Sequence, residues 1–585
     1  MVASRPRNLV LAIDVGTGSV RAALLDLRGR TVAFRAREHD QIVPSFGRTE
    51  QRPADWWAGA VASIRDVLDA VEGGAQRVVA VAACGQMHGT VLIDAAGELV
   101  LDSVQLWNDK RATAQVSAFS AANDVDALWP LTSNPPSVAW PGFKLQWIAR
   151  HQPEALARAS TVLMPKDYIN FRLTRRRAMD ESDASCTYLF DARTNAWSPL
   201  LALRLGIDPE LLPPVQHALA VIGVVTSEAA GDTGLLSGTP VAAGTSDFAA
   251  TLLGSGVSSE HRGSDITGTS TLITAYAPQP LKDPIITNMR TADGAWAAFT
   301  ILDAGGDAMR WARRALHRNE ASYEAIAAMA TAAPPGADRL LFLPYLNGER
   351  LGGAANARGE FFGLTSGHDA GHMHRAVMEG VAFAAKRNLA VLERKSGRIE
   401  SIIAAAGGAR GVWLEIKASI YDRPILVPAE AEAGVTGCAM IAAIAGGGQP
   451  IGRKPGNASS PSPTKSVPIP SGATVICATP NFSTRAMNRT AHYGSGSTRS
   501  TRAVRGRPRR LASQRWPHPE RRRAAPLSAG LPSLPQRSQR GRPRRTRDAP
   551  AAPIPMGTQG QLEMRRGRRE GWRQRRRRMP PCRRP

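Results

Sequence analysis

The chain has 585 residues, which is enough for two or more domains with hydrophobic cores of their own. Its net charge of +25 would suit a nucleic-acid-binding protein, but the charge is distributed unevenly. Residues 448–585 carry 32 Lys and Arg against 4 Asp and Glu, whereas residues 1–447 carry 42 against 45. We therefore expect the first 447 residues to form an ordinary, slightly acidic globular protein.

Three features of the sequence indicate the cellular compartment of the protein: its cysteines, its N-terminus and its hydropathy. Cys84, Cys186, Cys438, Cys477 and Cys582 are far apart and form no CxxC motif, which fits neither a disulfide framework nor a zinc site. The N-terminal apolar run reaches an acidic residue too early for a signal peptide, and no stretch of about 18 apolar residues predicts a membrane span. We expect a cytoplasmic protein.

Strands and helices alternate along the first hundred residues. Residues 8–16 (NLVLAIDVG) predict a buried strand, and residues 20–26 predict its partner after a glycine turn. Residues 77–89 predict another buried strand that runs into a polar turn. Residues 53–71 predict a helix whose apolar stripe comprises Trp57, Val61, Ile64, Leu68 and Val71. This order predicts a layered α/β domain.

A second glycine-rich region begins near residue 241, and we place a domain boundary at about residue 250. Further on, residues 402–406 predict a strand, Gly407 and Gly408 a turn, and the residues after them a helix. From residue 448 the chain is rich in Pro, Gly, Ser and Arg without sustained periodicity, so the segment 448–585 is predicted to be disordered.

Three glycine-rich turns follow strand-like segments, at residues 14–21, 268–272 and 406–411. A plain hairpin needs only the glycines, whereas a metal–phosphate site also needs an anion for Mg²⁺, amides and a cation. The first turn taken alone favours a hairpin. Three such turns in one α/β chain indicate a nucleotide cleft between two domains. The first turn offers Asp14, Gly16, Thr17, Gly18, Ser19 and Arg21.

Longer motifs make a resemblance to a known family specific. IDVGTGSVR resembles the first phosphate loop of the FGGY carbohydrate kinases, and residues 140–151 (WPGFKLQWIARH) and 359–380 resemble their two signatures. FLPYLNGER and MPKDYINFRLT are also similar, and the motifs fall in the family's order over about residues 8–447. The resemblance implies the two-domain actin/Hsp70-type ATPase fold, which is ribonuclease H-like, with sugar and first phosphate loop on residues 1–250 and nucleotide on 251–447.

The resemblance also implies ATP and Mg²⁺ as cofactors and a role for individual residues. Asp247 matches the catalytic base that accepts a proton from a sugar hydroxyl; an aspartate at that position could otherwise be a helix N-cap. Asp14 is assigned to Mg²⁺. The ATP and phosphate residues are Asp14, Thr17, Gly18, Arg21, Gly268, Thr269, Gly408 and Ala409, and the sugar residues are Met87, His88, Trp107 and Asp247.

Two short motifs favour one branch of the family. CGQMHG (84–89) and LWNDKR (106–111) are most similar to xylulokinases, so D-xylulose is the expected substrate, with another ketose, aldose or sugar alcohol as the alternative. The sequence departs from the xylulokinase pattern in two places: Phe248 replaces an amide that would face the sugar, and, as a smaller change, the nucleotide turn is AGGAR rather than GGGAR.

Several of these residues also have a purely structural interpretation. His88 could be a satisfied structural histidine and Trp107 a core residue. Lys144 and Trp147 are interpreted as structural, because the first signature marks packing. His368, His372 and His374 have the types of metal ligands, but they lie where the second signature begins a helix, and we interpret them as structural.

Two interpretations of residues 448–585 compete. Runs such as RRGRREGWRQRRRR could bind nucleic acid non-specifically, which is the alternative function from another class. We favour a frameshift near codon 448, because the familial pattern stops around Gly447 and gives way to Arg, Pro, Ser and Ala. An inactive frameshifted product is therefore a further alternative to an active kinase. We expect no specific nucleic-acid partner and no membrane partner. The sequence does not decide whether the protein is a monomer or a homodimer.

The frameshift hypothesis predicts a difference between two versions of the chain. Restoring the reading frame should add a helix that covers apolar surface, and should raise both stability and kinase activity. A version that ends near residue 447 should show neither gain. Thermal unfolding and ATP turnover of the two versions measure this, and equal activity from both would contradict the hypothesis.

Overall fold

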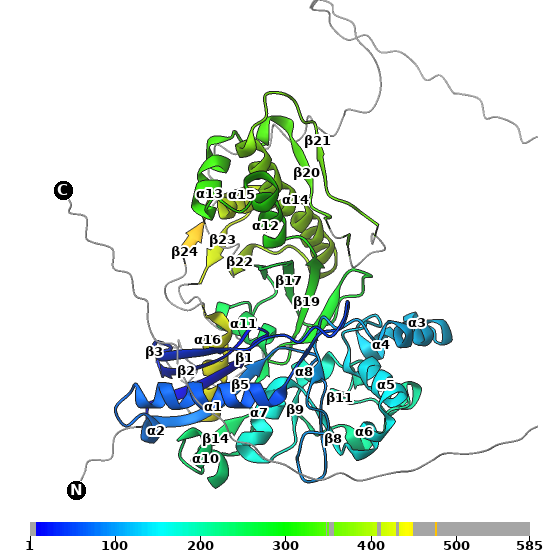
Figure 1. The fold of residues 1–585 in the computed structure, drawn as a ribbon, viewed down its shortest axis with the longest axis vertical. Coiled ribbons are helices and arrows are strands. Elements are labelled where there is room, and N and C mark those ends of the chain that lie inside the picture. Colours follow the sequence, from blue (N-terminus) through cyan, green and yellow to red (C-terminus); the bar gives the residue numbers. More distant parts are fainter. Residues whose placement is uncertain are drawn as a thin grey trace, which may run out of the picture. The chain divides into compact units, whose positions relative to one another are not determined.

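Two seven-stranded β-sheets organise the part of the chain that the computed structural model describes (Figure 1). The described residues are 7–346, 348–349, 356–405, 411–428, 432–447 and 474–476. The predictions for residues 448–585 therefore lie outside the described residues, except at the short strand β24 (Thr474–Ile476). Layers of helices on sheets confirm the expected α/β class.

The first sheet has the strand order β13-β14-β5-β1-β2-β3, and β15 also pairs with β5. β1 pairs antiparallel with β2, as the hairpin prediction requires, and parallel with β5. In this register Asp14 on β1 lies opposite Arg21 on β2 and Cys84 on β5. The strands are β1 (Leu9–Val15), β2 (Ser19–Asp26), β3 (Thr31–Glu38), β5 (Val78–Gly85), β13 (Val221–Val224), β14 (Pro240–Ala242) and β15 (Thr245–Ser246).

Both faces of β1 are covered, which explains why the strand is apolar without alternation. Leu9, Leu11 and Ile13 share one core with α1 (Pro53–Asp69), the helix predicted at residues 53–71. Val10 and Ala12 belong to a second core on the other face, with α16 (Ala433–Ala445). β1 is therefore a fixed central element from which Asp14 extends at one end.

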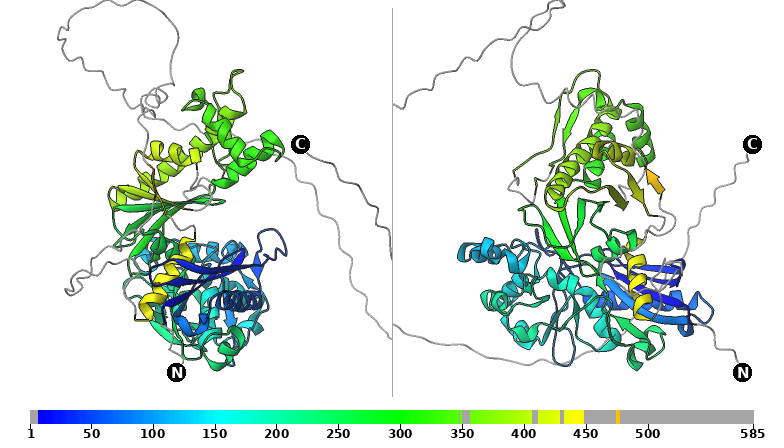
Figure 2. Two further views of the ribbon diagram at one scale, coloured as in Figure 1. Left: turned by 90° about the vertical axis from the view of Figure 1, so that its left-hand side faces the viewer. Right: turned by 180° about the vertical axis from the view of Figure 1, so that it is seen from behind.

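α16 lies along β1 and β5 and against α11 (Asp247–Ser255), although it is the last helix described (Figure 2). The two helices touch at backbone distance, because Gly254 and Gly437 face each other. A Cβ added at Gly437 would lie 1.9 Å from the carbonyl oxygen of Ala250, and one at Gly254 would lie 2.0 Å from that of Ala433. Residue 250, where the sequence suggests a domain boundary, lies inside α11.

The second sheet has the order β18-β19-β17-β16-β22-β23-β24 and packs against the long helix α14 (Ala370–Ser396). The predicted strand at residues 402–406 is β22 (Ser401–Ala405), and the predicted helix after it is α15 (Gly411–Tyr421). The turn between them lies outside the described residues. The other elements of this half are β16 (Arg262–Thr267), β17 (Thr271–Ala277), β18 (Thr287–Arg290), β19 (Trp296–Leu302), β23 (Ile425–Val427), α12 (Gly306–His317) and α13 (Tyr323–Ala332).

Shorter elements connect and extend the two sheets. They include five two-stranded pairs, β4 with β7, β6 with β8, β9 with β12, β10 with β11, and β20 with β21. Their bounds are β4 (Glu50–Gln51), β6 (Val91–Ile93), β7 (Val104–Gln105), β8 (Thr161–Leu163), β9 (Met179–Asp180), β10 (Phe190–Asp191), β11 (Ala196–Trp197), β12 (Val215–Gln216), β20 (Leu341–Leu343), β21 (Glu360–Phe362), α2 (Gly74–Arg77), α3 (Thr113–Ala122), α4 (Val125–Thr132), α5 (Pro141–His151), α6 (Pro153–Arg158), α7 (Pro165–Thr174), α8 (Glu181–Ser185), α9 (Pro199–Leu205) and α10 (Ser227–Thr233).

Two compositional expectations can be compared with the described residues. Among the described residues, Cys84, Cys186 and Cys438 are buried free thiols. Within the described ranges no helix has the length and apolar character needed to cross a membrane.

The contact between α11 and α16 predicts a strong position dependence for glycine substitutions. Gly437→Ala should lower the free energy of unfolding by about 1–3 kcal/mol, because the methyl group meets the Ala250 carbonyl and the helices must separate. Gly231→Ala in α10, where a Cβ meets nothing within 4 Å, is the control and should be neutral or stabilising by up to about 1 kcal/mol. Urea unfolding measures both, and equal effects would contradict the close helix contact.

Candidate functional site

The first glycine turn closes the β1–β2 hairpin. Gly16 N–H donates to the Ser19 carbonyl at 3.0 Å, and Gly18 is exposed, with nothing within 4 Å of the position that a Cβ would take. The turn thus leaves room for a ligand to approach its backbone. The hairpin interpretation is confirmed, and it is compatible with phosphate binding by the same turn.

Asp14, at the end of β1, is buried at 4% exposure and pairs with Arg21 across the hairpin. The Arg21 guanidinium donates to Asp14 Oδ2 at 2.9 Å, and it lies 3.5 Å from Glu432 Oε2. Asp14 Oδ1 is buried and has no hydrogen-bond partner among the described residues. Burial raises the pKa of Asp14, against the opposing effect of Arg21. One carboxylate oxygen is therefore left over for a further positive group.

Asp247 is the first residue of α11 but not its cap. Ser246 is the N-cap, and its hydroxyl accepts from the Ala249 N–H, so the N-cap interpretation of Asp247 is wrong. Asp247 Oδ1 accepts from the N–H of Phe248, at 2.7 Å, and the residue remains partly accessible. Burial, followed by the negative charge of Asp14, raises the pKa of Asp247 to about 7.

The start of α16 completes this group of charges. A Cβ at Gly434 would lie 3.9 Å from Asp14 Oδ2 and 3.9 Å from the Asp247 carbonyl oxygen, so α16 begins beside both aspartates. Glu432 precedes the helix and reaches Arg21. The Arg21 guanidinium thus contacts two carboxylates, Asp14 and Glu432, and its charge also acts on Asp247. Sequence reasoning missed Glu432, because a carboxylate before an apolar helix does not show which sheet the helix packs on.

The sugar-site residues proposed from sequence lie on two neighbouring loops. His88 is buried, has a left-handed backbone (φ +70°), and packs edge-to-face on Trp140 with ring centroids 5.1 Å apart. Its Nδ1 has no partner among the described residues, and burial lowers its pKa to about 3, so the ring is neutral. Met87 is partly buried, whereas Trp107 is 38% exposed, so the core interpretation of Trp107 is wrong.

A polar network joins the phosphate hairpin to these loops. Trp107 Nε1 donates to Thr17 Oγ1 at 3.2 Å, and Thr17 donates to Gln86 Oε1 at 3.1 Å. Gln86 donates to Gln51 Oε1 at 2.7 Å, and Gln51 returns a hydrogen bond to the Thr17 carbonyl. Gln51 and Gln86 were not predicted, because no local pattern marks a buried amide as part of a network.

The second glycine turn connects β16 and β17. Gly268 and Thr269 are exposed, and their carbonyls accept from the N–H groups of Gly306 and Asp307 at the start of α12. The turn therefore sits at the N-terminus of α12 and itself occupies two of that helix's first N–H groups. Gly408 and Ala409, assigned to the nucleotide, lie outside the described residues.

Comparison with known proteins assigns this arrangement to a family. Residues 9–254 match the N-terminal domain of the FGGY family of carbohydrate kinases, and residues 264–446 match its C-terminal domain.

The chain belongs to the FGGY family of carbohydrate kinases.

Individual relatives agree. The chain is 29% identical to the xylulose kinase of Bacillus subtilis (strain 168) over 444 residues, 75% of this chain and 88% of the relative. The crystal structure of xylulose kinase from Rhodospirillum rubrum superposes with a TM-score of 0.69 at 30% identity, covering 75% of this chain and 90% of that one. Gluconate kinase from Lactobacillus acidophilus gives a TM-score of 0.71 at 27% identity, with 75% and 89% coverage.

Family membership confirms the predicted actin-like α/β ATPase fold and the reaction class. The FGGY kinase uses ATP to phosphorylate an alcohol group of a carbohydrate.

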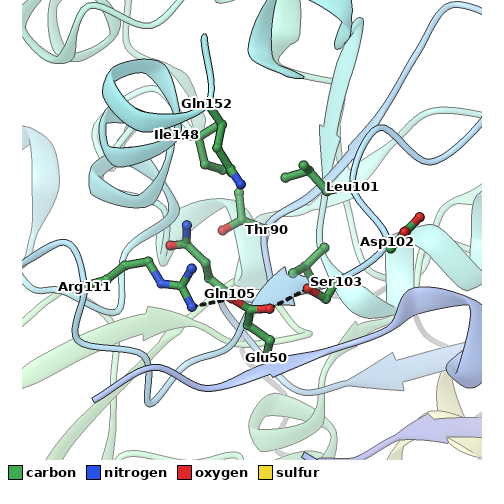
Figure 3. A pocket seen from close by; sticks show the side chains of 10 residues that line it. Glu50, Thr90, Leu101, Asp102, Ser103, Gln105, Arg111, Ile148 and Gln152 are labelled. Carbon is green, nitrogen blue, oxygen red and sulfur yellow. Dashed lines mark hydrogen bonds and ion pairs between the residues drawn. The ribbon is translucent and has the colours of Figure 1, made fainter. Parts of the chain in front are cut away.

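A cavity of about 130 Å³ lies beside the loop that carries Trp107, but none of the residues predicted for the site lines it. Figure 3 shows Arg111 and Ser103 reaching Glu50 from opposite sides. Arg111 also donates to Asp109, which accepts from the Thr49 N–H. This ion-pair network fixes residues 104–111 of the kinase from the side of β4.

The histidines of the second signature have structural contacts. His374 Nε2 lies 2.9 Å from His317 Nε2, and His372 contacts Asp369 and Asp338. Where the structure describes the chain, the one group with metal-like spacing is Asp167, Asp180 and Asp183, and the ammonium of Lys166 contacts all three.

The raised pKa of Asp247 predicts a pH-dependent cost to stability. The folded protein holds a proton on Asp247 up to about pH 7, whereas the unfolded chain releases it near pH 4, so this group's contribution to stability falls as pH rises between these values. Asp247→Asn should therefore stabilise the FGGY kinase more at pH 8 than at pH 5. Unfolding temperatures at the two pH values measure this; an equal change at both would contradict the assignment.

Proposed function

We propose that this FGGY kinase transfers the γ-phosphoryl group of ATP to D-xylulose, giving D-xylulose 5-phosphate, with Asp247 as the general base. The observation that supports the base is a carboxylate with a pKa of about 7 that caps no helix and lies beside Asp14. A base whose pKa is close to the working pH is both available and strong enough to accept a proton. The substrate rests on the relatives named xylulose kinase.

The proposed step requires the protein to accept one proton and to stabilise negative charge. Asp247 accepts the proton of the attacking sugar hydroxyl as the oxygen–phosphorus bond forms, and ADP leaves with the electron pair of the bond that breaks. Arg21 and the open backbone of the hairpin turn offset negative charge on the phosphate oxygens. As the nucleophile forms, the negative charge of Asp14 favours retention of the proton on Asp247.

The residues present fit a divalent cation at Asp14. Its Oδ1 is buried without a hydrogen-bond partner among the described residues, and Asp247 and Glu432 add negative charge nearby. Oxygen ligands and a surplus of negative charge suit Mg²⁺, held directly or through water. Bound there, Mg²⁺ would neutralise phosphate oxygens of ATP.

Sugar recognition is assigned to Met87, His88 and Trp107 with Asp247. Phe248, which stands where xylulokinases have an amide, is buried and packs on Phe299 with ring centroids 5.0 Å apart. A site without that amide has one polar contact fewer for the sugar. Because gluconate kinase is a comparable structural neighbour, gluconate is the second candidate substrate.

The two segments that match the family suggest that each binds a different substrate. We assign the sugar, the first phosphate loop and Asp247 to residues 1–250, and the nucleotide to residues 251–447, with closure of the two on substrate.

The proposal predicts sugar-dependent release of ADP. Among ketoses, aldoses, sugar alcohols and gluconate, D-xylulose should give the highest kcat/KM, and Asp247→Asn should lower kcat by about 10²–10⁴-fold because the base is lost. Asp124→Asn is the matched control, since Asp124 caps α4 and Asn caps equally well. A coupled ADP assay measures all of these.

Two outcomes would overturn the proposal. ADP release that is independent of any sugar would indicate an ATPase. Turnover that survives in Asp247→Asn would remove the assigned base.

A further inference from the structure

Lys144, in the second turn of α5, is fully buried without a carboxylate at salt-bridge distance among the described residues. Its ammonium donates instead to two backbone carbonyls, those of His88 at 2.6 Å and Leu106 at 2.7 Å. Burial lowers the pKa of Lys144 to about 7, with Asp109 opposing and Arg111 adding to the effect. Burying an ammonium group costs free energy of folding. Packing alone therefore does not explain why a lysine stands at position 144.

The two carbonyls belong to the two loops that carry the proposed sugar contacts. One is the carbonyl of His88 itself, and the other is that of the residue before Trp107. His88 has a left-handed backbone, which is unfavourable for a residue with a side chain and persists only where neighbours hold it. The hydroxyl of Thr90 also donates to the His88 carbonyl, at a longer 3.3 Å. The ammonium of Lys144 is therefore the stronger of the contacts that fix this backbone.

We propose that Lys144 is a positioning residue for the sugar: it cross-links the backbones of the His88 and Trp107 loops and so sets their spacing. The inference rests on the proposed function for the identity of the substrate, but the cross-link itself does not. Through Lys144, the first signature (residues 140–151) then contributes to substrate affinity as well as to packing.

The Trp107 loop and the phosphate hairpin are also held by groups other than Lys144. Arg111, Asp109 and Glu50 fix the Trp107 loop from β4, while the phosphate hairpin is closed by its own backbone and by Asp14 with Arg21. Thr17 of the hairpin contacts Trp107 and Gln86 through its hydroxyl. Loss of Lys144 should therefore loosen the sugar loops and leave the backbone of the phosphate hairpin in place. A merely structural lysine would affect both substrates alike or neither.

The first test compares Lys144→Met with Gln146→Met. Gln146 lies on the same helix and donates to the carbonyl of Leu205, away from the sugar loops. Lys144→Met should raise the KM for sugar by about 10–100-fold, the effect of losing a charged hydrogen bond, and leave the KM for ATP within about twofold. Gln146→Met should leave both KM values within about twofold. Equal changes in both KM values, or no change in the KM for sugar, would overturn the proposal.

A second readout needs no substrate. Amide hydrogen exchange in the unliganded protein should quicken at residues 86–90 and 105–109 in Lys144→Met, and stay unchanged at residues 19–26 of β2. Unchanged exchange in both loops would overturn the cross-link, even if no sugar on the panel is turned over and the proposed function fails. If Lys144→Met does not fold, Lys144→Gln, which keeps one N–H donor group, replaces it and is judged by the same criteria.

Discussion

The site depends on one electrostatic constraint, the placement of the Asp14 carboxylate at the buried end of β1 beside a second carboxylate. Burial raises the pKa of both Asp14 and Asp247, and the charge of Asp14 adds to the effect on Asp247. Among the described residues, Arg21 is the positive group in direct contact with Asp14. Because two like charges repel strongly away from water, the site is suited to accept a further cation and to hold a proton near neutral pH.

Meeting this constraint requires a rigid framework. β1 is buried on both faces, between the α1 core and the α16 core, so Asp14 cannot move away from its neighbours. α16 approaches α11 at backbone distance through Gly254 and Gly437, which brings the start of α16 to the aspartates. The network from Trp107 through Thr17 to Gln86 then ties the sugar loops to the same hairpin. Side-chain hydrogen bonds thus connect the phosphate hairpin to the sugar loops.

Local sequence patterns predicted the elements whose contacts lie close together in the sequence. The β1–β2 hairpin, α1 and the strand–helix pair of β22 and α15 follow from apolar periodicity and glycine turns, and the motif order predicted the family. Glu432, the left-handed backbone of His88 and the contacts of Lys144 could not be predicted, because each depends on a partner far away in the sequence. The N-cap interpretation of Asp247 failed because the serine before it caps the helix.

The central claim is that these carboxylates direct a phosphoryl group from ATP to a sugar hydroxyl. Phosphorus NMR of the protein with ATP, Mg²⁺ and D-xylulose follows the γ-phosphorus itself. The account predicts that its signal is replaced by that of a sugar phosphomonoester, with little inorganic phosphate. Inorganic phosphate as the sole product, or an unchanged ATP spectrum, would contradict it.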